Sequence, residues 1–353
     1  MFHDIPTLDH FDRMTDSTGI IQHGIYNLPR RESGYTTDDN ARALRLCVWL
    51  WSVQSDERML RRISCYLSFL EHARCPVRGF HNFLSYQRDW LDAAGTGDCQ
   101  GQAVLALAEV MASDLPDGYR ALARELIKSV LPTLAELRSL RAQAYVIQAW
   151  AQLWRAGVTD FGSFEEVSRL AADRLVDCYH RSHRSDWLWF ESRMTYANAV
   201  LPHALFDAAQ IWPQSEYRSV AESSFRFLDH VTTTNDTFCP VGNRDWYSRG
   251  EEKSPFDQQP VEASTMASAA LAGLELHGIE ECRPAFLRAH QWFHGRNVLG
   301  LPLADEKYGG CFDGLQENGV NQNQGAESTI AYLWTEWLRV SAKSMHELQR
   351  ANT

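Results

Sequence analysis

The strongest constraint on the fold is a regular alternation of two kinds of helical segment. Segments that are apolar on all sides begin near residues 38, 100, 140, 195, 261 and 327. Between them lie segments with a single apolar stripe, such as residues 57–73 and 117–137. A helix that is apolar all round has to be buried, whereas a one-sided helix lies at the surface. The sequence therefore predicts an inner and an outer layer of helices.

The spacing of the inner helices predicts how the two layers close. Their starts are about 60 residues apart, the length of one helical hairpin with its loops. Six hairpins form an all-α (α/α)6 toroid, and a short helix around residues 8–18 brings the total to twelve. An α-solenoid is the alternative, but it should show a short repeat with a recurring consensus, which the sequence lacks. No linker or low-complexity segment divides the chain, so we expect one domain over residues 1–353.

Composition narrows the possible partners. The 353 residues are 44% hydrophobic, which favours a globular chain over a disordered one. The net charge of −11 argues against binding to nucleic acid or to an anionic membrane. No apolar run reaches the length of about 18 residues that a membrane-spanning helix needs, and the first residues lack a signal-peptide pattern.

The cysteines bear on redox state and metals. None of the eight lies in a CxxC pair, so neither a zinc site nor a disulfide framework is predicted. We expect reduced thiols, a cytoplasmic location, and neither a metal nor another cofactor. The sequence leaves the oligomeric state open.

Polar segments lead into five of the inner helices, at residues 34–42, 97–102, 186–198, 256–264 and 309–328. In a toroid these helix ends meet at one mouth, so we expect Asp38, Glu191, Glu262 and Glu327 to share a pocket. Acids and amides bind hydroxyl groups, aromatic rings pack on sugar rings, and two carboxyls can catalyse glycoside hydrolysis. The pattern is typical of a carbohydrate site.

We predict that two carboxyls, those of Asp39 and Glu262, are nearest the chemistry. Substrate binding is predicted for a larger set of acids, amides and aromatics: Tyr35, Asp38, Asp98, Trp189, Glu191, Tyr196, Asn198, Trp246, Gln258, Gln259, Asp313, Asn323 and Glu327.

Each of these candidates also has a structural explanation. First-turn acids stabilise helix starts as caps or through the helix dipole, and Asp313 fits a turn. Aromatic residues pack in cores, and His23, His81 and His203 are more often structural than functional.

Four of the polar segments resemble a known family. They are GYTTDDNARAL (34–44), WFESRMTYANA (189–199), FDQQPVEA (256–263) and NQGAEST (323–329). They resemble a bacterial helical domain of the six-hairpin glycosidase class, which occurs alone or C-terminal to a glycosyltransferase domain. The resemblance implies the (α/α)6 fold and sugar binding. The chain has no Gly-rich strand–helix turn and no room for a nucleotide-sugar-binding pair of domains, which argues against transferase activity.

Our main functional hypothesis is a metal-independent glycoside hydrolase that acts on an oligosaccharide with inversion. A sugar phosphorylase would need a cationic cluster, for which Arg30, Arg31 and Arg193 are the candidates. A sugar epimerase would need histidines that converge on the pocket. A non-catalytic carbohydrate-binding module would keep the aromatics and amides but would not need so many acids.

Overall fold

The computed structural model describes residues 6–75 and 78–351, with side chains up to residue 342. The described residues form twelve α-helices, the number expected: α1 (Asp9–Met14), α2 (Thr37–Trp51), α3 (Glu57–Ala73), α4 (Gly97–Ala112), α5 (Asp117–Leu134), α6 (Leu140–Arg155), α7 (Gly162–Ser182), α8 (Val200–Ile211), α9 (Tyr217–Val231), α10 (Pro260–His277), α11 (Cys282–Phe293) and α12 (Ala326–Ala351).

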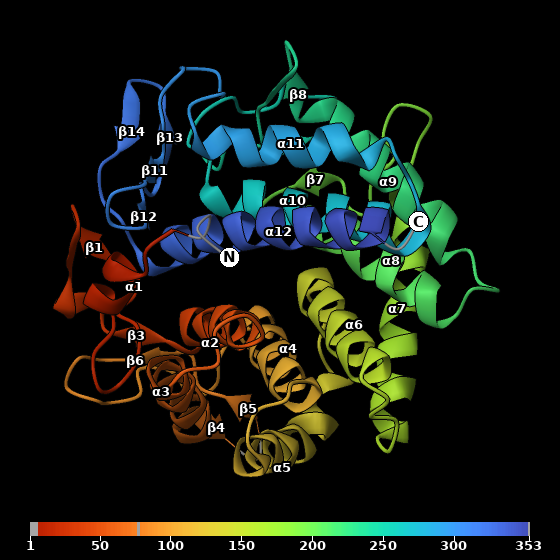
Figure 1. Cartoon of the computed structure of the whole chain (residues 1–353). Coiled ribbons are helices and arrows are strands. Elements are labelled where there is room, and N and C mark those ends of the chain that lie inside the picture. The colour runs from red at the N-terminus through yellow and green to blue at the C-terminus, as the bar shows by residue number, and fades with distance from the viewer. Residues whose placement is uncertain (1–5, 76–77, 352–353) are drawn as a thin grey trace.

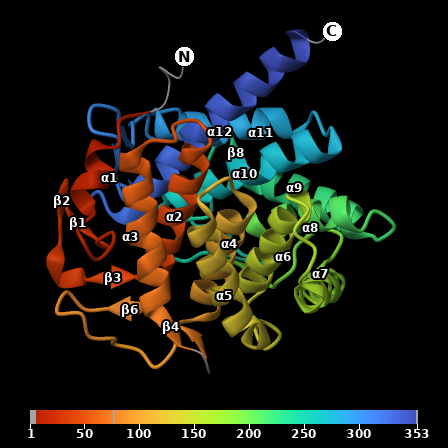
Figure 2. The ribbon, with the colours of Figure 1, turned by 60° about the horizontal axis from the view of Figure 1, so that its bottom comes forward.

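The even-numbered helices form a closed inner ring. Each packs on the next, from α2 through α4, α6, α8 and α10 to α12, and α12 packs back on α2. The odd-numbered helices lie outside them, and Figure 2 shows α3, α5 and α7 along the outer surface. This arrangement confirms the predicted (α/α)6 toroid and excludes the open α-solenoid.

Burial follows the predicted two layers. Helix α4 is buried on nearly every side, whereas α3 and α9 bury one stripe each. The core also takes up large aromatic side chains, among them Trp150, Trp189 and Trp292. No helix in the described part of the chain combines the length and the apolar character that crossing a membrane requires.

Short antiparallel strands connect the helices: β1 (Gly24–Ile25), β2 (Leu28–Pro29), β3 (Tyr35–Thr36), β4 (Arg74–Cys75), β5 (Gly79–Phe80), β6 (Phe83–Leu84), β7 (Arg193–Met194), β8 (Thr233–Thr234), β9 (Thr237–Phe238), β10 (Tyr247–Ser248), β11 (Ala304–Asp305), β12 (Gly310–Cys311), β13 (Gly314–Gln316) and β14 (Gly319–Asn321). Two of these pairings, β3 with β6 and β7 with β10, join different loops. Figure 1 shows β13 and β14 at one edge of the ring, not far from β1.

One inner helix begins later than predicted. The apolar pattern predicts an inner helix that begins near residue 195, but α8 begins at Val200. Ala197 has a positive φ of 45°, and the backbone N–H groups of Ala197 and Asn198 donate to the carboxylate of Glu262. This contact between two loops holds residues 195–199 in a turn, and sequence periodicity cannot reveal such a contact.

Candidate active site

A cavity of about 410 Å³ lies where the inner helices α2, α10 and α12 begin. Its lining is largely polar and comes from six loops and helix starts: Gln22, His23, Thr36, Asp38, Asp39, Arg42, Asn82, Phe83, Asn243, Asp257, Gln258, Gln259, Asp313, Gly314, Gln316, Asn321, Gly325, Glu327 and Ser328. The volume is in the range of small-molecule binding sites.

One guanidinium organises the carboxylates of the cavity. Arg42 Nη1 lies 3.1 Å from Asp39 Oδ1, and Arg42 Nη2 lies 3.4 Å from Asp38 Oδ1 and 3.2 Å from Glu327 Oε2. All four side chains line the cavity. Three carboxyls thus share a single positive charge, and we refer to these four residues as the Arg42 cluster.

A threonine, and neither aspartate of this cluster, caps α2. The N-cap of α2 is Thr36, whose Oγ1 accepts a hydrogen bond from the backbone N–H of Asp39 at 3.1 Å. The same hydroxyl donates to Asp39 Oδ2 at 2.7 Å. Asp38 and Asp39 are therefore not the residues that cap α2, and both face the cavity.

Burial and like charges set the protonation of this pair. Burial raises the pKa of Asp39 to about 7, because it outweighs the attraction of Arg42, and the charges of Glu327 and Asp38 add to the rise. The pKa of Asp38 is raised as well, first by burial and then by Glu327 and Asp98. A carboxyl that keeps its proton near neutral pH can act as a general acid.

Asp313 faces the cavity from the turn between β12 and β13. Its Oδ1 accepts the backbone N–H of Gly325 at 2.7 Å, next to the start of α12. A side chain at position 325 would crowd this carboxylate, since an added Cβ would lie 3.1 Å from Asp313 Oδ1. Asp257 also lines the cavity, but its Oδ2 accepts from Arg244 Nε at 3.0 Å.

A second group of predicted site residues lies around Arg141, outside the cavity lining. Arg141 Nη1 donates to Glu191 Oε2 at 3.1 Å and Nη2 to Asn198 Oδ1 at 3.4 Å. Its guanidinium lies 4.7 Å from the ring centre of Tyr196, whose hydroxyl donates to Asp98. We refer to Arg141 with Asp98, Glu191, Tyr196, Asn198 and Glu262 as the Arg141 cluster.

Glu262 is the most enclosed carboxyl of this second group. Its oxygens accept from the N–H of Ala197, from the N–H of Asn198 at 3.4 Å and from Asn198 Nδ2 at 3.2 Å. Burial raises the pKa of Glu262 to about 7, although these hydrogen bonds and the charge of Arg141 act to lower it. The expected single pocket thus divides into two neighbouring clusters, and Glu262 lies in the one that braces the loop before α8.

The remaining predicted residues are placed differently. Trp189 and Tyr35 are buried in the core, and the hydroxyl of Tyr35 donates to Asp16 Oδ2 at 2.7 Å. Trp246 is half-buried beside Tyr196, with ring centres 6.4 Å apart. Asn323 Oδ1 accepts the backbone N–H of Tyr26 at 2.9 Å.

The two glutamines predicted before α10 both line the cavity. The side-chain amide of Gln258 is hydrogen-bonded to neighbouring residues: Nε2 donates to Pro255 O, and Oε1 accepts from Trp292 Nε1. Gln259 is the residue immediately before α10 and is half-buried.

Several cavity residues were not predicted, and Arg42 is the most important of them. Its spacing of three and four residues from Asp39 and Asp38 is a sequence signal, because such side chains neighbour one another on a helix. Asn82, Asn243 and Gln316 give no comparable signal. They reach the cavity from loops whose course is set by tertiary packing.

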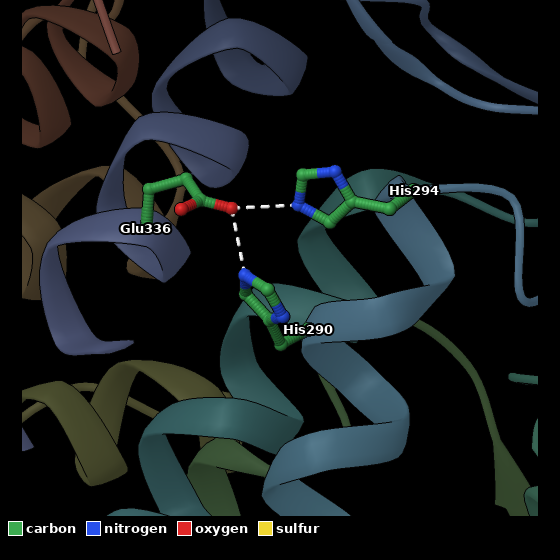
Figure 3. A group of neighbouring side chains, drawn as sticks. All are labelled: His290, His294 and Glu336. Atoms are coloured by element: carbon green, nitrogen blue, oxygen red, sulfur yellow. Dashed lines mark hydrogen bonds and ion pairs between the residues drawn. The ribbon is translucent and has the colours of Figure 1, made fainter. Parts of the chain in front are cut away.

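Among the described residues, one group of side chains has the composition of a metal site (Figure 3). His290 Nε2 and His294 Nε2 each lie 2.7 Å from Glu336 Oε1, and Arg339 Nε lies 2.9 Å from Glu336 Oε2. His294 Nδ1 also lies 3.0 Å from Glu306 Oε1. Glu336 is nine residues beyond Glu327 on α12, about 14 Å along the helix, so this group is separate from the cavity.

The hydrogen bonds of this group favour an ion network over a metal centre. Burial alone would raise the pKa of Glu336, but the hydrogen bonds from His290 and His294 hold it well below its usual range. The hydrogen bond to Glu336 raises the pKa of His294. A metal ion would have to displace these donors. The absence of a metal from the function stays a prediction.

Comparisons with known proteins agree on the fold. A sugar epimerase from a ruminal bacterium superposes with a TM-score of 0.72 at 9% identity, over 93% of this chain and 94% of that one. The cellobiose 2-epimerase of Bacillus thermoamylovorans gives 0.73 at 12% identity, over 95% and 96%. The GH76 α-mannanase of Bacteroides thetaiotaomicron gives 0.68 at 10% identity, over 95% and 93%.

No protein-family model matches the sequence. No curated protein matches it either. The chain thus has the fold of the six-hairpin glycosidase class, as the resemblance implied. At these identities the likeness defines the fold, and activity has to be argued from the site.

Proposed function

We propose that this protein is a glycoside hydrolase that acts on a neutral oligosaccharide through the carboxyls of its cavity. The main observation in support of this proposal is the Arg42 cluster, in which three carboxyls share one guanidinium at the cavity wall. Like charges this close cannot all ionise freely, so one carboxyl keeps a proton. Asp39, with a pKa of about 7, is the group we propose as the general acid.

Hydrolysis also needs a base that activates water. We propose Asp313 for this role, because it reaches the cavity from a different loop and a backbone N–H fixes its position. Asp39 would donate its proton to the leaving glycosidic oxygen, while Asp313 would take a proton from the attacking water. Separate acid and base carboxyls are typical of inverting glycosidases.

The charge of the cavity supports a neutral substrate. Five acidic side chains line it, Asp38, Asp39, Asp257, Asp313 and Glu327, against the single arginine Arg42. A phosphate or a uronic acid would be repelled by such a wall. The arginines considered for phosphorolysis are engaged elsewhere: Arg30 with Glu32, Arg31 with Tyr86, and Arg193 with the backbone of Asp245. These observations favour hydrolysis over phosphorolysis.

Sugar epimerisation is the second candidate, because several structures with this fold are described as epimerases. Among the described residues, His23 is the histidine that lines the cavity of the Arg42 cluster. His203 lines a separate cavity of about 80 Å³, which borders the same Arg42 and Glu327. The predominance of carboxyls over histidines favours the hydrolase.

One experiment separates the two reactions. The protein is incubated in D₂O with cellobiose and with α-1,6-mannooligosaccharides, and the products are followed by NMR and mass spectrometry. A hydrolase releases new reducing ends without deuterium on carbon. An epimerase that abstracts a carbon-bound proton incorporates deuterium at that carbon and leaves the glycosidic bond intact. Binding with neither change would instead indicate a carbohydrate-binding module.

A further inference from the structure

Exposed aromatic side chains are concentrated at one side of the cavity. Among the described residues, the large aromatics with exposed side chains are Tyr26, Phe83, Tyr86, Trp154 and Tyr196. Phe83 lines the cavity itself, and Tyr86 follows three residues later. Tyr26 lies in the turn of the β1–β2 hairpin, three residues after the lining residue His23. Trp154 lies instead in the last turn of α6, at the opposite end of an inner helix.

The backbone at Phe83 is held rigidly. Phe83 pairs with Thr36 in the β3–β6 ladder, which places it beside the start of α2. Its N–H donates to Asp92 Oδ1 at 2.9 Å, and its carbonyl accepts the N–H of Leu91 at 2.8 Å. Despite this fixed backbone, 42% of the residue is exposed.

Tyr86 is supported on one face only. Its ring stacks on that of Tyr35, with centres 6.3 Å apart and planes 18° from parallel. Its hydroxyl accepts from Arg31 Nε at 3.1 Å. The ring is therefore fixed in orientation, and 39% of the residue remains exposed. A buried partner behind and solvent in front is the arrangement that a stacking platform requires.

Tyr196 differs from these residues although its exposure is similar. The Arg141 guanidinium covers its ring, and its hydroxyl donates to Asp98. Its contacts hold it in the Arg141 cluster, outside the cavity lining. The aromatics that remain open to a ligand are Phe83, Tyr86 and Tyr26. They lie on the loops that carry β6 and β1, at the same side of the cavity. Figure 2 shows β1, β2, β3 and β6 together along one side of the ring.

We propose that Phe83, Tyr86 and Tyr26 form an outer binding surface for further sugar units of the substrate. This proposal rests on the proposed function. The substrate it defines is an extended neutral oligosaccharide, whose reacting bond lies at the Arg42 cluster and whose remaining units pack on the aromatic rings. Sugar rings present apolar C–H faces, and the neighbouring polar groups of His23, Asn82 and Arg31 suit their hydroxyls.

The test is the dependence of affinity on chain length. Isothermal titration calorimetry is run with cello- and α-1,6-mannooligosaccharides of two to six units on wild type, Phe83→Ala, Tyr86→Ala and Trp154→Ala. For the series that binds, wild-type affinity should rise with length. Phe83→Ala and Tyr86→Ala should each reduce the affinity for the longest member by about fivefold or more, because partial burial of an aromatic ring is lost. Trp154→Ala is the matched control and should keep the wild-type dependence.

Phe83→Tyr retains an aromatic ring and should retain the gain with length, so it separates loss of stacking from a general disturbance. If wild type hydrolyses the short members but gains no affinity with length, the outer surface is refuted and the proposed function stands. If wild type binds with an affinity that rises with length but hydrolyses nothing, the outer surface stands and the hydrolase proposal fails. If neither series is bound or turned over, both proposals fail. A wild-type dimer that Tyr26→Ala dissociates, with unchanged oligosaccharide affinity, would assign the exposed hairpin to a protein partner and overturn the proposal.

Discussion

The two arginine-centred clusters show how similar residues can serve different ends. Both lie at the starts of inner helices, and each contains a buried carboxyl whose pKa is raised to about 7. In the Arg42 cluster three carboxyls face a cavity and share one cation. In the Arg141 cluster, the carboxylate of Glu262 accepts hydrogen bonds from two backbone N–H groups and from the side-chain amide of Asn198. We therefore assign the proposed chemistry to the Arg42 cluster, whose carboxyls line a cavity, and not to Glu262, which does not.

The largest expected difference between the clusters is in turnover. Asp39→Asn keeps the shape of the side chain but removes the ionisable proton. General acid catalysis contributes about 10²–10⁴-fold, so kcat should fall by that order on the substrate found with the D₂O assay. Asp207→Asn is a matched control, because Asp207 is also a buried aspartate paired with an arginine, Arg155, but does not line the cavity. Equal loss of turnover in both variants would place the effect in folding rather than catalysis.

The pH profile sharpens the comparison further. If Asp39 has to be protonated, kcat/KM should fall about tenfold per pH unit above its pKa of about 7. Buffers from pH 5 to 9 at constant ionic strength would show this alkaline limb. A rate that stays constant up to pH 9 would exclude Asp39 as the general acid and leave it a binding role.

Glu262→Gln tests the second cluster, and here we expect the main effect on stability. The glutamine amide keeps one acceptor oxygen but replaces the other with an NH₂ donor, which would face a backbone N–H group of Ala197 or Asn198. An unsatisfied buried donor costs about 1–3 kcal/mol, so the free energy of unfolding should fall by that amount in urea denaturation. The catalytic role predicted for Glu262 from the sequence gives the opposite result: turnover would collapse while stability stayed close to wild type.

Glu262 also makes stability depend on pH in a defined direction. Burial raises its folded pKa from 4.5 to about 7, so between these values the folded chain binds more protons than the unfolded chain. Stability from this group is therefore present at low pH and is lost as the pH rises through about 7. The glutamine variant should show a shallower decline over this range, which thermal melts at several pH values would measure.

The sequence predicted the fold more fully than the site. Periodicity determines which helices are buried, and six buried helices with short loops leave few ways to close a ring. It also pointed to four acids that line the cavity: Asp38, Asp39 and Glu327 at helix starts, and Asp313 in the polar segment that leads into α12. It did not separate Glu262 from them, since its partners Ala197 and Asn198 are 64 or more residues away.

The sequence also did not show which residue caps α2. An acid at the start of α2 could have served as its cap, but the hydroxyl of Thr36 does so. Burial of the aromatics is likewise a tertiary property. Trp189 lies in a polar segment of the kind expected at a sugar site, yet its ring is fully enclosed. Phe83 lies in the short strand β6, and nothing in the sequence around it distinguishes it from a core residue.

The smallest expected effect concerns metal. The His290–His294–Glu336 group has metal-ligand residue types, but both oxygens of Glu336 already accept hydrogen bonds, from the two histidines and from Arg339. A divalent ion would have to displace both imidazole N–H groups, and the nearby Arg339 charge opposes it. Dialysis against EDTA should therefore change neither turnover nor melting temperature, and added Zn²⁺ should not raise the melting temperature. A loss of activity that Zn²⁺ restores in wild type but not in Glu336→Gln would show that this network is a metal site.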